Sequence, residues 1–265
     1  MAQQSPIMTI MTRAVEKAGR SLVRDFGEVE QLQVSRKGPS DFVTAADKKA
    51  EKIIFEELKK AKPTYSFMME ESGEVKGEDT DHVWIIDPLD GTHNFMHGIP
   101  HWCISVALEQ KGQVIAGIVF DPVKDELFRA EKGMGAFMRN KRLRVSGRHD
   151  LESAMIMTGD VSRTPEGQEQ FRKELKAVAA VAPMIRRYGS AALDLAYVAA
   201  GRLEVFWERN LKPWDCAAGA LLVKEAGGFV SSIENEDNPI YSKSLISGNP
   251  AIHKEIRQIL KQNSP

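Results

Sequence analysis

The sequence has few cysteines, no surplus of either charge and no long apolar run. It contains two cysteines among 265 residues, which excludes the disulfide scaffold of small secreted proteins. Cys103 and Cys216 both lie in apolar surroundings, so we expect buried, reduced thiols, as suits the cytosol. The 36 Lys and Arg residues balance 37 Asp and Glu residues, which excludes a strongly basic nucleic-acid coat and a strongly acidic solvating chain.

The lack of long apolar segments bears on where the protein works. No apolar run approaches the ~20 residues that a membrane helix needs. Residues 6–15 are interrupted by Thr and Arg, and no basic segment precedes them, so we find no secretory signal peptide. We therefore expect a cytoplasmic protein that does not associate with membranes.

Length and composition indicate one compact unit of moderate size. Apolar residues make up 42% of the chain, which is ordinary for a globular protein. A length of 265 residues fits one large domain or two subdomains that share a core. Because residues 139–150 are polar and basic, we divide the chain there into an N-terminal α+β subdomain (1–148) and a C-terminal α/β subdomain (149–265).

The spacing of apolar residues predicts alternating element types. Spacings of three and four indicate helices at 7–23, 45–60, 166–181, 190–200, 215–227 and 250–262. Short β-branched apolar runs indicate strands at 83–86, 103–108, 113–120, 126–130, 135–138, 154–159, 203–207 and 228–233. Lys111 and Gly112 are predicted to turn a hairpin. Strands in hairpins followed by strands that alternate with helices predict an α/β or α+β fold, with mixed sheets in layers covered by helices.

The segment WIIDPLDGTHNF at 84–95 is the most informative part of the chain. An apolar strand leads directly into Asp87 and Asp90, with Pro88 restricting the backbone and Gly91 allowing a sharp turn. Two carboxylates this close repel each other unless a cation lies between them, and ligands that are all oxygen favour Mg²⁺ over Zn²⁺. The backbone N–H groups of Gly91 and Thr92 follow and are placed to face a phosphate.

Other acidic residues lie at comparable positions. Glu70 and Glu71 follow the apolar run SFMM at a predicted strand end, Asp41 and Asp47 flank a further acidic position, and Asp215 begins an alanine-rich helix. The acidic turn at 87–90 and Asp215 each have a purely structural alternative, because Asp commonly caps a turn or a helix N-terminus. That alternative is stronger for Asp215.

Histidines offer a rival metal site. His93, His97 and His101 are four residues apart, and on one continuous helix they would line a face that binds Zn²⁺. Gly98 and Pro100 argue against such a helix. We therefore favour loop histidines near the mouth of the site.

Taken together, the motifs resemble those of the inositol monophosphatase family of Mg²⁺-dependent, lithium-sensitive phosphatases. The matching segments are DFVTAAD (41–47), EES (70–72), WIIDPLDGTHNF (84–95), GSAALDLAYVAAG (189–201) and PWDCAAGALLVKEAGG (213–228). The resemblance implies the sugar-phosphatase fold, an αβαβα sandwich, with the active site between its two halves. It also implies a homodimer, which most relatives form.

The resemblance also implies roles for individual residues. The metal ligands, for two or three Mg²⁺ ions, would be Glu70, Asp87, the carbonyl of Leu89, Asp90 and Asp215. Asp47 and Thr92 would orient the attacking water beside Glu70. The substrate would contact Asp90, Gly91, Thr92, Gly189, Ser190, Ala191, Glu208 and Asp215. Lys37 would lie in a mobile loop that closes the site and assists a third metal.

Two kinds of function stay open at this point. The first is hydrolysis of a small phosphomonoester, with myo-inositol 1-phosphate as the first candidate; the rivals are histidinol phosphate, fructose 1,6-bisphosphate, adenosine 3′,5′-bisphosphate and NADP. The second is a binding role, because a bacterial branch of the family also associates with RNA polymerase and Nus factors in antitermination. Surface residues would carry that role, and Arg186, Arg187 and the basic run 139–148 are its candidates.

Overall fold

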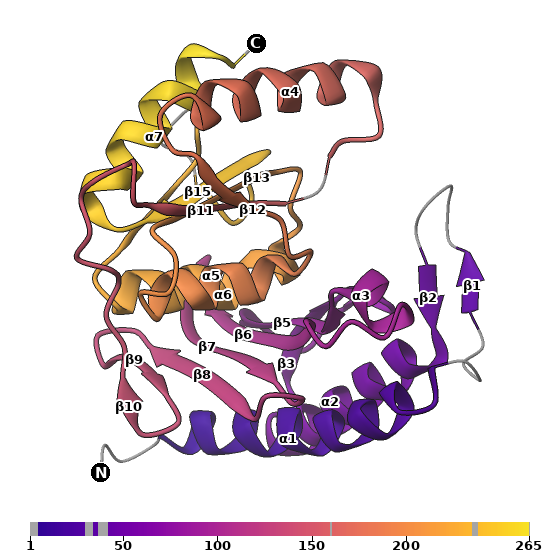
Figure 1. Cartoon of the computed structure of the whole chain (residues 1–265). Helices are drawn as coiled ribbons and strands as arrows, with labels where there is room; N and C mark the ends of the chain where they lie inside the picture. Colours follow the sequence, from indigo (N-terminus) through magenta and orange to yellow (C-terminus); the bar gives the residue numbers. More distant parts are fainter. Residues whose placement is uncertain (1–4, 30–33, 37–41, 160, 235–237, 265) are drawn as a thin grey trace.

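The structure is a computed structural model that describes residues 5–29, 34–36, 42–159, 161–234 and 238–264. Within these residues the chain forms five layers in which helices and sheets alternate (Figure 1). The helices that make up the three helical layers are α1 (Pro6–Phe26) with α2 (Ala45–Ala61), α5 (Ala191–Ala199) with α6 (Pro213–Glu225), and α4 (Pro165–Ala179) with α7 (Pro250–Gln262). The predicted αβαβα layering is confirmed.

Helix α1 shows how the outer layer follows from the sequence. The Ser5 side chain accepts a hydrogen bond of 3.0 Å from the backbone N–H of Met8, and Pro6 occupies the first helical turn, where its missing N–H costs nothing. Met8, Met11, Val15 and Leu22 recur at helical spacing and are fully buried. Each such side chain contributes about 1.5–3 kcal/mol when it leaves water, which fixes the helix on the sheet.

The larger sheet contains eight of the described strands, in the order β10-β9-β8-β7-β6-β5-β3-β4. The strands are β3 (Tyr65–Met69), β4 (Gly73–Val75), β5 (Asp79–Asp90), β6 (Cys103–Gln110), β7 (Gln113–Asp121), β8 (Glu126–Glu131), β9 (Gly135–Met138) and β10 (Lys141–Arg142). Strands β3 and β5 are parallel, and the other neighbours are antiparallel. The predicted hairpin at Lys111 and Gly112 is confirmed: both residues have positive φ, 50° and 76°, as a tight primed turn requires.

Strand β5 is longer than the predicted 83–86 because it continues through the acidic motif. Asp87 pairs with Ser105 and Asp90 pairs with Cys103, so three residue steps on β5 face two on β6. This bulge tolerates Pro88, which has no N–H to donate. Successive side chains of a strand normally point to opposite faces of the sheet, and the bulge shifts this alternation by one residue. Asp87 and Asp90 therefore both face the α5–α6 layer, as Cys103 does, whereas Leu89 faces the other side of the sheet.

The second sheet contains five of the described strands, in the order β12-β11-β13-β15-β14. They are β11 (Met155–Thr158), β12 (Met184–Arg186), β13 (Val205–Arg209), β14 (Phe229–Ser231) and β15 (Ser244–Gly248). Both faces of this sheet are covered, by α5 and α6 on one side and by α4 and α7 on the other (Figure 1). The chain leaves the larger sheet at Arg142, the end of β10, and enters the second sheet at Met155, the start of β11. The predicted division of the chain at residue 148 lies between these two points and stays a prediction.

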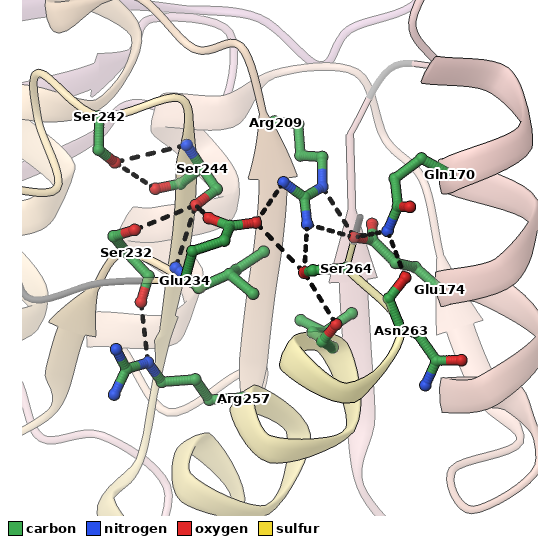
Figure 2. A network of polar contacts seen from close by, with 12 residues as sticks. Gln170, Glu174, Arg209, Ser232, Glu234, Ser242, Ser244, Arg257, Asn263 and Ser264 are labelled. Carbon is green, nitrogen blue, oxygen red and sulfur yellow. Dashed lines mark hydrogen bonds and ion pairs between the residues drawn. The ribbon is translucent and has the colours of Figure 1, made fainter. Parts of the chain in front are cut away.

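A polar network ties the outer helices to this second sheet (Figure 2). Arg209 of β13 donates from Nε to Glu174 Oε1 of α4 at 2.7 Å and from Nη1 to Glu234 Oε1 at 2.5 Å. It also reaches Ser264, beyond the end of α7, at 3.0 Å. Because Glu174 is 1% exposed, the arginine supplies the charge that makes its burial tolerable.

Several short elements differ from the prediction. Strands β1 (Val34–Arg36), β2 (Phe42–Thr44), β4, β10, β12 and β15 and the short helix α3 (Thr92–Met96) were not predicted. Strand β15 is buried along its whole length, yet its Ser-rich sequence has the composition of a loop. The first four of these strands have only two or three residues each, too few for a periodicity to show.

Helices α5 and α6 explain the alanine-rich sequences in the second half of the chain. Every residue of α5 is buried, and so is α6 from Cys216 to Val223, because both helices lie between two sheets. Cys103 and Cys216 are buried, free thiols, as predicted. Among the described residues, no helix combines the length and apolarity needed to cross a membrane.

Candidate active site

The acidic turn at the end of β5 is held by its own backbone. Asp87 is 2% exposed, and its Oδ1 accepts a 2.9 Å hydrogen bond from the N–H of Leu89. The Thr92 hydroxyl donates to the Leu89 carbonyl at 3.0 Å. Gly91 has a φ of 96°, and a Cβ there would lie 3.0 Å from the His101 carbonyl oxygen, so both backbone angle and space require glycine.

Asp90 is bound by the N-terminus of α5. Its Oδ2 accepts hydrogen bonds of 2.7 Å from the Ser190 hydroxyl and 2.7 Å from the N–H of Ala192. Two predicted site segments that are about a hundred residues apart in sequence are thereby brought into direct contact. Hydrogen bonds to an ionised carboxylate are stronger than neutral ones, so they fix the position of Asp90.

Glu70 follows β3 and lies beside Asp87, because β3 and β5 are parallel neighbours with Met69 opposite Ile86. The N–H of Glu70 donates to the Ile86 carbonyl at 3.2 Å. Glu51 of α2, which was not predicted as a site residue, is 2% exposed and accepts from the N–H of Glu71 at 2.8 Å. A buried carboxylate of α2 therefore shapes the turn that presents Glu70.

Asp215 fulfils the structural role that the sequence offered for it, and its role in the site stays a prediction. It lies in the first turn of α6, where its Oδ2 accepts a 2.7 Å hydrogen bond from the N–H of Lys212, so it does cap the helix. Its neighbour Trp214 accepts a 3.0 Å hydrogen bond at its carbonyl from Ser105, the residue opposite Asp87. Ser105, also missed from the sequence, thereby holds the start of α6 over the end of β5.

These carboxylates lie close enough to perturb one another. Burial raises the pKa of Glu70 to about 8, and the charges of Asp215, Glu71 and Asp47 act in the same direction. Burial also raises the pKa of Asp87 well above its usual range, reinforced by the charges of Glu70, Asp90 and Asp215. The pKa of Asp215 is raised to about 7 by burial and by Asp90. Burial and the mutual repulsion of these carboxylates thus disfavour their ionised forms in the described structure.

The donor set fits a hard divalent cation. Its members offer oxygen atoms only, and a cation would offset the repulsion that raises their pKa values. As they stand, no three His, Cys, Asp or Glu side chains in the described ranges are grouped closely enough to hold a metal. The structure therefore places the predicted ligands as neighbours rather than as a closed coordination sphere, and their ligand roles stay predictions.

The later half of the chain contributes a second group of predicted site residues, Gly189, Ser190, Ala191 and Glu208, which we call the second wall. Gly189 has a φ of 81° and lies against Asn94, whose Nδ2 donates to the carbonyls of Tyr188 at 2.7 Å and His101 at 2.8 Å. Asn94 lies inside the 84–95 motif, but no pattern assigned it this bridging position. Glu208 of β13 packs directly on Gly159, where a Cβ would overlap its carboxylate. Ala191 begins α5 next to Ser190.

The remaining predicted residues fall in different places. Helix α3 ends at Met96, so the three histidines share no helix face; His93 and His97 are exposed, whereas His101 is largely buried. The zinc alternative is not supported in the described part of the chain. Asp47 is buried in the first turn of α2. Lys37 and Asp41 lie outside the described residues.

Comparison with known proteins now decides the family. The sequence model of the inositol monophosphatase family matches residues 3–264. The chain belongs to the inositol monophosphatase family. It is a phosphoric monoester hydrolase on that ground, and the fold and function class that the motifs predicted are confirmed.

Individual members of the inositol monophosphatase family match almost the whole chain. The inositol-1-monophosphatase of Rhizobium meliloti (strain 1021) is 52% identical over 99% of this chain and 98% of that protein. The Nus factor SuhB of Escherichia coli (strain K12) is 41% identical over 94% of this chain and 93% of that protein. The crystal structure of extragenic suppressor protein suhB from Bartonella henselae has a TM-score of 0.94 at 53% identity, covering 97% of this chain and 99% of that one.

Proposed function

We propose that this phosphatase acts on a small, hydroxylated phosphomonoester with Mg²⁺ as its cofactor, and that myo-inositol 1-phosphate is its first substrate. The observation that carries this proposal is the group of buried and partly buried, mutually repelling carboxylates around the end of β5. The printed name of the Rhizobium meliloti relative supports the choice of substrate.

The metal ligands in this proposal are Glu70, Asp87, the Leu89 carbonyl, Asp90 and Asp215, for two or three Mg²⁺ ions. Bound Mg²⁺ would supply a water of lowered pKa and would neutralise the charge that develops on the leaving oxygen. The bulge in β5 supports this assignment, because it turns Asp87 and Asp90 to the same face.

The chain's own groups position the reactants. Asp47 and Thr92 would orient the attacking water, with Glu70 beside them to accept its proton. The N–H groups of Gly91 and Thr92 would hold the phosphate oxygens. The buried position of Asp47 next to the charge of Glu70 supports its place in this set.

The alcohol part of the substrate would lie against the second wall. Gly189, Ser190, Ala191 and Glu208 line it, together with Asp90 and Asp215 of the acidic cluster. Carboxylates accept hydrogen bonds from hydroxyl groups, so Glu208 would recognise a polyol and discriminate against an alcohol without hydroxyls. The hydrogen bond from Ser190 to Asp90 supports this arrangement, because it connects the second wall to the acidic cluster.

Three further expectations belong to the same proposal. Lys37, which lies outside the described residues, would assist a third metal. The protein would work as a homodimer in the cytoplasm. Ile99 and Tyr188, whose side chains are exposed near the second wall, support a self-associating surface there.

Phosphate release from myo-inositol 1-phosphate tests the enzyme proposal. We expect activity with Mg²⁺, none after EDTA treatment, and a loss of several orders of magnitude in Asp87→Asn. Asp81→Asn changes an exposed aspartate in the same strand and is the matched control, which should keep wild-type activity. Unchanged activity in Asp87→Asn would refute the metal assignment, and a parallel assay with histidinol phosphate decides between the two main substrates.

A second candidate function is association with the transcription machinery. The name of the Escherichia coli relative, Nus factor SuhB, is the observation that favours it. Arg186 and Arg187 are exposed residues at the end of β12, and Arg187 is partly engaged through a 2.9 Å hydrogen bond to the Gly159 carbonyl. A pull-down with purified RNA polymerase and Nus factors, using wild type, Asp87→Asn and Arg186→Ala, tests this role; no retention of wild type would refute it.

A further inference from the structure

A buried carboxylate and one nitrogen of a largely buried imidazole behind the site have no hydrogen-bond partners in the described structure. Asp194 lies in the first turn of α5, is 1% exposed, and has no partner for either oxygen. The Nε2 atom of His101 is buried and also unpartnered. The two groups face each other, with Nε2 4.0 Å from Asp194 Oδ1.

Two unsatisfied polar groups at this separation are costly. A buried polar group without a hydrogen-bond partner destabilises the fold, and a buried anion without a partner does so more strongly. An approach of about 1 Å would bring the two atoms to hydrogen-bond length. The imidazole ring has little freedom to turn elsewhere, because Tyr188 and Tyr197 contact it edge-on with centroids 5.1 Å and 5.9 Å away.

Burial first, and the surrounding charges second, decide which group carries the proton. Burial, together with the charges of Glu208 and Asp90, raises the pKa of Asp194 well above its usual range. Burial and Lys124 lower the pKa of His101 to about 4, against the opposing effect of Asp121. A neutral carboxyl has one O–H to donate, and a neutral imidazole has one nitrogen that accepts.

The position of the two groups links them to the acidic turn. Ser190 and Ala192, in the same helical start as Asp194, hold the Asp90 carboxylate. The His101 backbone lies directly behind Gly91 and is fixed by Asn94. A bond between the two side chains would therefore connect the two supports of the Asp90–Gly91 turn.

We propose that Asp194 donates a hydrogen bond from a protonated carboxyl to Nε2 of His101, and that this pair positions the Asp90–Gly91 turn for the reaction. Neither residue touches the substrate, so both act as positioning residues. The second half of this statement rests on the proposed function, whereas the hydrogen bond itself does not.

Nitrogen NMR of the metal-free, ¹⁵N-histidine-labelled protein tests the bond. His101→Phe, which keeps the ring packing, assigns the signals of His101. We expect Nε2 to be an unprotonated acceptor in wild type, to shift in Asp194→Leu, and to stay close to wild type in Asp194→Asn, whose amide also donates. A protonated Nε2 in wild type, or one that does not respond to Asp194→Leu, would overturn the proposal.

Kinetics test the positioning role. Loss of such an outer support typically costs 10–100-fold in activity or metal affinity, so we expect Asp194→Leu to lower kcat and to raise the Mg²⁺ requirement by about that factor. Asp194→Asn should keep most of the wild-type rate. Equal activity in Asp194→Leu and wild type, or equal loss in the Leu and Asn variants, would overturn the role.

A folding control separates these results from simple damage. The double variant Asp194→Leu/His101→Phe leaves neither polar group unpaired, so it should melt at a higher temperature than Asp194→Leu alone while its activity stays low. A double variant that melts below both single variants would contradict the pairing. If wild type released no phosphate at all, the proposed function would fail, and the NMR experiment would still decide the hydrogen bond.

Discussion

The replacement Glu70→Gln should stabilise the metal-free protein while it abolishes phosphatase activity. Glu70 is a partly buried carboxylate whose neighbours are other carboxylates. Glutamine has nearly the same shape and keeps an oxygen that accepts the hydrogen bond from Asp87. It is neutral in both the folded and the unfolded chain, so folding no longer has to hold a charge, or bind a proton, among the other carboxylates.

The size of the effect follows from the pKa of Glu70, which is about 8 in the folded protein against an ordinary value of 4.5. A raised carboxyl pKa means that the unfolded chain loses this proton first, so stability falls as pH rises from 4.5 to about 8. Each pH unit in that window costs about 1.4 kcal/mol. At pH 7 the cost is about 3 kcal/mol, and Glu70→Gln should recover most of it.

Urea unfolding in EDTA at pH 5 and pH 7 measures this directly. We expect wild type to lose stability between the two pH values and Glu70→Gln to lose much less. With Mg²⁺ added at pH 7, wild type should gain stability by ligand linkage and the variant should gain far less. Glu74→Gln, an exposed glutamate in β4, should behave as wild type. A Glu70→Gln protein that is less stable than wild type in EDTA at pH 7 would refute this reasoning.

Three other substitutions test separate parts of the site and fold. Ser190→Ala removes a 2.7 Å hydrogen bond to Asp90 and should lower kcat/KM about tenfold. Gly159→Ala would place a Cβ 1.7 Å from a Glu208 oxygen, so KM for inositol 1-phosphate should rise while p-nitrophenyl phosphate, which has no polyol, is affected less. Arg209→Met leaves the buried Glu174 carboxylate of α4 without its cationic partner, with only the hydrogen bond from Gln170 remaining, and should cost about 3 kcal/mol in urea unfolding, with KM unchanged.

Each of these three predictions would be contradicted by a specific result. Ser190→Ala with wild-type kinetics would show that Asp90 does not depend on α5. A Gly159→Ala protein that loses both substrates equally would remove Glu208 from substrate recognition. An Arg209→Met protein as stable as wild type would show that the network in Figure 2 contributes no net stability.

The acidic motif could be read from the sequence because its signals are local. An apolar strand, a proline, two aspartates and a glycine lie within eight residues, and the bulge that turns both aspartates to one face is built from the same segment. The long helices and most of the buried strands were predicted for the same reason: their periodicity is contained in one stretch of chain, whereas the buried strand β15 was missed.

The supports of the site could not be read in this way. Glu51 lies on an otherwise amphipathic helix, where a glutamate is ordinarily a solvated residue, and Ser105 is one polar residue inside an apolar strand. Their contacts, to Glu71 and to Trp214, depend on packing between distant segments. Asp194 and His101 likewise come close to each other only when the layers of the fold pack together.

The most direct test of the account is a crystal structure of the protein grown with Mg²⁺ and phosphate. The account predicts metal density bounded by Glu70, Asp87, the Leu89 carbonyl, Asp90 and Asp215, with the phosphate against Gly91 and Thr92. Metal-free carboxylates in the presence of excess Mg²⁺, or ions held by other residues while phosphate release continues, would contradict it.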